Sequence, residues 1–130
     1  MNIVNRSLTL NQNVGNSTVE CIAGCTVELT TWELAALAVP NAGYTLTCVL
    51  EANDPGRSSD EVRFTFPFPA TFNNPLKILD ADDIFRDTVG VAILNEDVNG
   101  SDEIRARFTL VNNSTGQSVI RRSPSVSIVL

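Results

Sequence analysis

The chain has 130 residues, the length of a single domain, and 43% of them are hydrophobic while 18% are charged. A chain of this size and composition buries enough apolar surface to fold without a metal ion or a disulfide. It has no histidine, which excludes Ser–His–Asp and Cys–His catalysis and any metal site built on imidazole. The net charge of -6 argues against nucleic acids and anionic membranes as partners, because both bind positive surfaces.

The N-terminal third predicts three strands, at residues 4–10, 17–22 and 25–30. Only Ala23 and Gly24 separate the second strand from the third, which predicts a tight turn. One helix is expected over residues 31–38, because Thr30 and Glu33 have the spacing of a capping box.

The middle of the chain predicts a hairpin between residues 44–50 and 61–68, since apolar and polar residues alternate in both segments. The turn chemistry of residues 54–56, Asp-Pro-Gly, supports it. In the second strand four large apolar side chains share one parity and are expected to be buried: Val62, Phe64, Phe66 and Phe68. Pro67 has no N–H for a sheet ladder, so this strand is expected to lie at an edge or to end there.

The C-terminal half predicts a second hairpin, between residues 89–94 and 104–110, with Ile93 opposite Ile104. A short turn is expected before it, at residues 80–85. After it, the turn Asn113-Ser114-Thr115-Gly116 is followed by two further strands, at residues 117–121 and 125–130.

Short strands separated by frequent turns are typical of an all-β fold. The sequence therefore predicts one domain, residues 1–130, built as an antiparallel β-sandwich with about eight or nine strands and one short helix. Both an immunoglobulin-like sandwich and a jelly roll fit this pattern.

Three cysteines, Cys21, Cys25 and Cys48, allow at most one disulfide within the chain. The expected arrangement is three buried thiols, because unpaired cysteine is commonly buried. A bridge between Cys21 and Cys48 is the main alternative.

Three arginines form a candidate patch for an anion or an acidic partner. In the register of the second hairpin, Arg105 lies beside Ala92 and Arg107 beside Gly90, and the following turn brings Arg122 close to Arg107. Guanidinium groups over small residues suit a carboxylate or a phosphate. The simpler interpretation is that these arginines are solvated and cover the outer face with their stems.

Asp97, Asn99 and Asp102 form a weaker candidate, a calcium loop between the strands of the second hairpin. The loop opens like an EF-hand loop, but Ala106 occupies the position of the essential glutamate. An ordinary hairpin tip explains the same residues. The acidic segment at residues 79–87 could likewise bind a cation or serve in catalysis, but a solvated connection explains it equally well.

These features predict a non-catalytic protein-interaction or structural module with no cofactor. The alternative is a small ligand-binding domain that uses calcium or carbohydrate at its Asp- and Asn-rich loops. Sheet edges are commonly protected by lysine or proline, and Lys77 is the only lysine, so self-association into a homo-oligomer is expected. A protein partner is the other expectation, and with no signal peptide or long apolar run, the default compartment is the cytoplasm.

Overall fold

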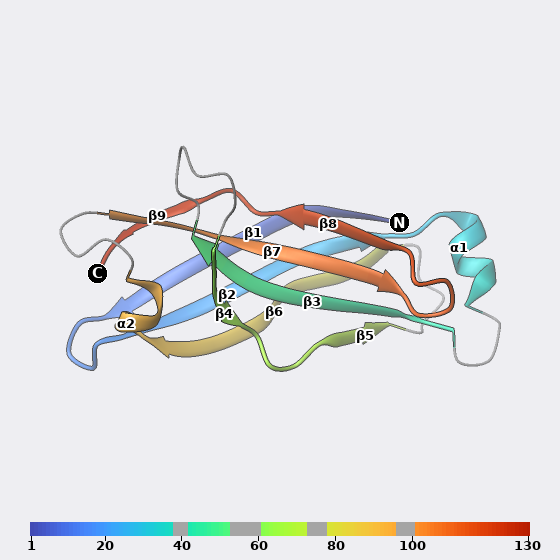
Figure 1. Ribbon diagram of the computed structural model, residues 1–130. Coiled ribbons are helices and arrows are strands. Elements are labelled where there is room, and N and C mark those ends of the chain that lie inside the picture. The colour runs from blue at the N-terminus through green and yellow to red at the C-terminus, as the bar shows by residue number, and fades with distance from the viewer. Residues whose placement is uncertain (38–41, 53–60, 73–77, 96–100) are drawn as a thin grey trace.

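The computed structural model describes residues 1–37, 42–52, 61–72, 78–95 and 101–130. Its strands form two antiparallel sheets packed as a sandwich (Figure 1), which confirms the predicted all-β fold. The three-stranded sheet has the order β1 (Asn2–Asn13), β2 (Thr18–Glu28), β6 (Ile78–Gly90). The six-stranded sheet has the order β4 (Glu61–Thr65), β3 (Tyr44–Ala52), β7 (Ser101–Asn112), β8 (Ser118–Arg122), while β5 (Ala70–Phe72) pairs with β3 and β9 (Val126–Val129) pairs with β7.

This strand order corresponds to that of immunoglobulin-like sandwiches, in which strands A, B and E share one sheet and strands C, F and G the other. Here β1, β2 and β6 take the first set of places, and β3, β7 and β8 take the second. The N-terminus lies toward the end of the sandwich that carries α1 (Thr31–Ala36), and the C-terminus toward the end with α2 (Val91–Leu94) (Figure 1).

The core lies between the inward faces of the two sheets. Its rings form a chain from Phe66 through Phe85 to Phe108, with centroid separations of 5.6 and 6.2 Å. Phe85 belongs to β6 and Phe108 to β7, so this chain connects the two sheets. Such tilted ring contacts add to the stabilisation from burial of the rings.

Several local predictions are confirmed. β3 pairs with β4 as the predicted hairpin does, although residues 54–56 lie outside the described part of the chain. The turn between β7 and β8 closes with Gly116 at a φ of 77°, a left-handed conformation that favours glycine. At α1 the Thr30 side chain accepts from the Glu33 N–H, and the Glu33 carboxylate accepts from the Thr30 N–H.

The predicted turn at Ala23-Gly24 is wrong, because β2 runs through both residues as one continuous strand. The turn predicted at residues 80–85 is also wrong, because that segment belongs to β6. The register of β2 with its two neighbours shifts here, because extra residues of β1 bulge out opposite Cys25 and extra residues of β6 bulge out opposite Gly24. The small residues that suggested a turn are buried in the central strand of the sheet.

The predicted pairing of residues 89–94 with residues 104–110 is wrong. β6 ends at Gly90 and pairs with β2, residues 91–94 form α2, and β7 pairs with β3. The reason is that the chain leaves one sheet here and enters the other, so a short helical turn replaces the strand. The N–H of Val91 donates to the carbonyl of Ser17 at 2.9 Å, which ties α2 to the β1–β2 turn.

The predicted burial of four apolar side chains at residues 62–68 is only partly right. Phe66 is 6% exposed, whereas Val62 is 44% and Phe68 is 83% exposed. β4 ends at Thr65, and the prolines on either side of Phe68 interrupt the alternation that the sequence pattern implies.

The described strands on every edge of the sandwich carry a feature that interrupts pairing with another chain. β1 and β6, the two edges of the three-stranded sheet, each bulge at a residue with positive φ, Asn5 at 50° and Asp83 at 52°. The edges of the six-stranded sheet are split into short strands, with Pro67 and Pro69 between β4 and β5, and Pro124 between β8 and β9. Bulges, prolines and short edge strands all hinder edge-to-edge pairing.

The contrast between Phe108 and Phe68 gives a test of the core. Phe108→Ala is expected to lower the free energy of unfolding by about 3–5 kcal/mol, because it empties a fully buried site. Phe68→Ala is expected to change it by less than about 0.5 kcal/mol, because that ring is exposed. Denaturant unfolding measures both, and equal losses would contradict this placement of the two rings.

Candidate functional site

The most unusual group in the described structure is the carboxylate of Glu51, which is 0% exposed although it lies on the outward-facing side of β3. The β3–β7 register places Arg105 directly opposite Glu51, and the β7–β8 register places Arg107 opposite Arg122. All three arginines therefore reach the same carboxylate from adjacent strands.

The contacts are short. Oε1 of Glu51 accepts from Nε of Arg105 at 2.8 Å and from Nε of Arg122 at 2.6 Å. Oε2 accepts from a terminal nitrogen of Arg107 at 3.3 Å. Hydrogen bonds between ionised partners are stronger than neutral ones. We call Glu51 with these three arginines the Glu51 cluster.

Two opposing effects act on the pKa of Glu51. Burial raises it, because a charged carboxylate loses its hydration, but the hydrogen bonds and charges of Arg122 and Arg105 outweigh burial. The pKa is therefore held below its ordinary value of 4.5, and Glu51 is ionised at neutral pH. Glu51 thus brings one negative charge to the three positive charges of these arginines, in a protein of net charge -6.

The structure thus brings together Arg105, Arg107 and Arg122, but it does not place them over Gly90 and Ala92. The predicted placement of Gly90 and Ala92 beside these arginines is wrong, because the predicted hairpin does not form. Gly90 ends β6 beside Thr18, and Ala92 lies in α2.

Sequence reasoning missed Glu51. The strand pattern at residues 44–50 assigns odd-numbered positions to the outer face, and Glu51 is the next such position. Pairing residues 104–112 with that strand, and not with residues 89–94, would have placed Glu51 opposite Arg105.

The candidate calcium loop is described only in part. Asp97 and Asn99 lie outside the described residues, and Asp102 lies in β7 with 3% exposure, facing the core. No group of three or more Cys, Asp or Glu side chains within the described ranges could hold a metal ion. The acidic segment at residues 79–87 lies in β6, where Asp83 occupies the bulge and Asp87 shares the inward parity of Phe85.

All three cysteines are described, and all are buried thiols without a disulfide, as expected. Burial raises the pKa of Cys21 to about 12, and the nearby Asp87 carboxylate adds to the rise. Burial likewise raises the pKa of Cys48 far above its ordinary value. Thiols in this state are poor nucleophiles, because the thiolate is the reactive form.

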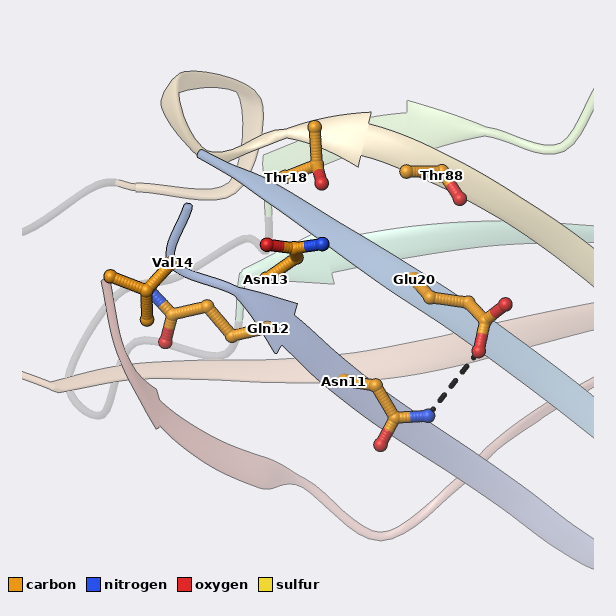
Figure 2. Close-up of a pocket in the computed structure, with 7 residues that line it drawn as sticks. All are labelled: Asn11, Gln12, Asn13, Val14, Thr18, Glu20 and Thr88. Carbon is orange, nitrogen blue, oxygen red and sulfur yellow. Dashed lines mark hydrogen bonds between the residues drawn. The ribbon is translucent and has the colours of Figure 1, made fainter. Parts of the chain in front are cut away.

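A shallow polar hollow of about 490 Å³ lies at the β1–β2 turn, on the three-stranded sheet (Figure 2). It is lined by Asn11, Gln12, Asn13, Val14, Thr18, Glu20 and Thr88. The amide of Asn11 points toward Glu20 and donates to its carboxylate at 3.4 Å. The lining residues include no aromatic ring, so the hollow lacks the stacking surface that sugar sites commonly use.

Comparison with known proteins finds no family model that matches the chain, and no similar curated protein or solved structure. Neither α1 nor α2, the helices of the described residues, is long and apolar enough to cross a membrane.

The buried thiols give a prediction about reactivity. The folded protein is expected to react with a thiol reagent such as DTNB only as fast as it unfolds, because no thiol is exposed and burial also raises the pKa values of Cys21 and Cys48. The same protein in denaturant is the control and is expected to react at all three cysteines. Rapid labelling under native conditions would contradict the placement of these side chains.

Glu51→Gln tests the cluster. The variant is expected to lose about 1–3 kcal/mol of unfolding free energy at neutral pH, because three partly exposed guanidinium groups lose their charge-assisted hydrogen bonds to the carboxylate. Because the folded state lowers the pKa of Glu51, its contribution is complete above pH 4.5 and is lost as the pH falls through the folded-state pKa. The difference between wild type and variant should therefore shrink on acidification.

Glu61→Gln is the matched control. Glu61 also pairs with an arginine, Arg63, at 3.1 Å, but its side chain is 54% exposed. An exposed pair contributes about 0–1 kcal/mol, so this variant should lose little stability. Similar losses for the two variants in urea unfolding would contradict the special role of the buried carboxylate.

Proposed function

We propose that the chain is a non-catalytic protein-interaction module that docks a partner on the outer face of its six-stranded sheet. One observation carries this proposal: the part of that face away from the Glu51 cluster is uncharged and largely β-branched. Its uncharged outward positions, taken from the strand registers and alternating with buried residues, include Thr45, Thr47, Val49, Thr65, Thr109, Val111, Ser118 and Ile120. Depletion of charge at the centre of a surface is typical of protein interfaces.

The face is continuous across the strands. One row joins Thr47, Thr109 and Ile120 from β3, β7 and β8, and the Ile120 side chain is 46% exposed. The next row joins Val49 to the Arg107–Arg122 pair of the Glu51 cluster. We call the uncharged rows together with Arg107 and Arg122 the docking face.

The interrupted strand edges favour contact with a partner through a sheet face over edge-to-edge pairing. Bulges in β1 and β6, and prolines beside the short edge strands, hinder the edge-to-edge pairing that the scarcity of lysine had suggested. A second copy of the chain is one partner that such a face can take, and a different protein is the other.

The shifted titratable groups support a non-catalytic role. Five shifted groups among the described residues have pKa values moved away from neutrality: those of Glu33 and Glu51 are lowered, while those of Cys21, Tyr44 and Cys48 are raised. General acids and bases work best with pKa values near the working pH.

The polar hollow supports the second candidate, a small ligand-binding module. Its amide, hydroxyl and carboxylate groups suit hydrogen bonding to a polar ligand. A melting temperature that rises with millimolar calcium and falls back with EDTA would support the calcium form of this candidate. An unchanged melting temperature would exclude calcium as the ligand.

Two matched variants test the docking face. Thr47 and Thr88 are both exposed threonines, on the outer faces of opposite sheets. Thr47→Lys is expected to abolish retention of a specific protein from a lysate of the source cells, because a lysine would have to be desolvated in the contact. Thr88→Lys should retain it, and light scattering of both variants reports any loss of self-association. Equal retention by both variants, or loss only with Thr88→Lys, would contradict the proposal.

A further inference from the structure

We propose that the docking face recognises a single carboxylate in an otherwise uncharged surface of a partner protein, and that this carboxylate binds the guanidinium pair of Arg107 and Arg122. This inference rests on the proposed docking function and names the chemistry of its partner. The two residues are register partners across β7 and β8, at the border of the uncharged rows. A partner seated on those rows brings its own side chains directly over the pair.

The pair has unused hydrogen-bonding capacity. A guanidinium group carries several N–H donors, and Glu51 takes one from each arginine. Among the described residues Arg107 and Arg122 bond only to Glu51, and their side chains remain 30% and 42% exposed. Planar guanidinium groups hold carboxylates with defined geometry, which gives specificity as well as affinity.

Glu51 prepares the site without neutralising it. Its single charge holds the arginines in place, so less side-chain entropy is lost when a ligand binds. An apolar cluster of similar volume would often stabilise a sheet as well as a buried ion cluster does. Stability alone therefore gives little reason to bury Glu51 under arginines, whereas positioning two of them for a ligand does.

The charge balance favours a protein carboxylate over a polyanion. The whole chain carries -6, so a nucleic acid or an anionic membrane would be repelled by the rest of the surface. A single acidic side chain within an otherwise uncharged contact matches both the positive pair and the threonine- and valine-rich rows beside it.

The test measures binding of a rhodamine-labelled peptide that carries one glutamate among uncharged residues, by anisotropy at low salt, to the full chain and to two variants. Arg122→Gln and Arg121→Gln make the same charge change at adjacent positions of β8, but only Arg122 contacts Glu51, while Arg121 bonds to the carbonyl of Ile120. Arg122→Gln is expected to weaken peptide binding about tenfold or more, as loss of a charge-assisted hydrogen bond would. Arg121→Gln is expected to change it by less than about twofold.

A third variant separates guanidinium geometry from charge. Arg107→Lys keeps the positive charge but loses the planar fork, and it is expected to weaken binding while near-UV circular dichroism shows a folded protein. Equal weakening by Arg121→Gln and Arg122→Gln would overturn the proposal, because it would indicate general electrostatics. No binding of the peptide to the wild type, or tighter binding of an oligonucleotide or of anionic vesicles, would also overturn it.

This outcome is distinguishable from failure of the docking function. If Thr47→Lys abolishes partner retention but Arg122→Gln leaves peptide binding unchanged, the docking function is supported and the proposed recognition of a carboxylate is wrong. If neither variant has an effect, both proposals fall.

Discussion

A carboxylate with no exposure to water must be paired with positive charge, and Glu51 meets this constraint through three arginines from two neighbouring strands. The pairing depends on the registers β3–β7 and β7–β8, since a slip by one residue would turn either arginine-bearing strand face away from Glu51. The same registers align the threonine and valine rows of the outer face. The ionic cluster and the candidate docking face therefore depend on one arrangement of the three strands.

The second constraint is the exposure of strand edges. A sandwich of two open sheets has four edges, and here all four are interrupted among the described strands, by bulges at Asn5 and Asp83 or by proline-flanked short strands. The protection is achieved with one lysine in the whole chain. Interrupted in this way, the described edges hinder pairing with a strand of another chain.

Much of the fold could be predicted from alternation and turn chemistry, because these act within a few residues. The α1 capping box, the β3–β4 pairing and the Asn113–Gly116 turn are local features, and the structure contains them. Long-range pairing was harder to predict. Residues 89–94 alternate like a strand and precede another alternating segment, yet the chain crosses between sheets at α2. Alternation does not reveal which strand becomes the neighbour.

The candidate site shows the same limit. The clustering of Arg107 with Arg122 followed from a tight turn, whereas Glu51 is more than fifty positions from either arginine and becomes their neighbour only through β3–β7 pairing. The exposure of Phe68 could not be predicted for a different reason. Its position in the alternation is that of a buried residue, but prolines on both sides interrupt the strand. In each case the missing information was the global path of the chain.

Glu51 acts as a buried anion that holds the arginines in place. The most direct test is to follow the side-chain carboxyl carbon of Glu51 by NMR as the pH is lowered, in the intact folded protein. We expect a titration midpoint below 4.5, with slowly exchanging Nε–H signals from Arg105 and Arg122 that are lost as Glu51 protonates. A midpoint at or above 4.5, or rapid exchange of those signals at neutral pH, would contradict it.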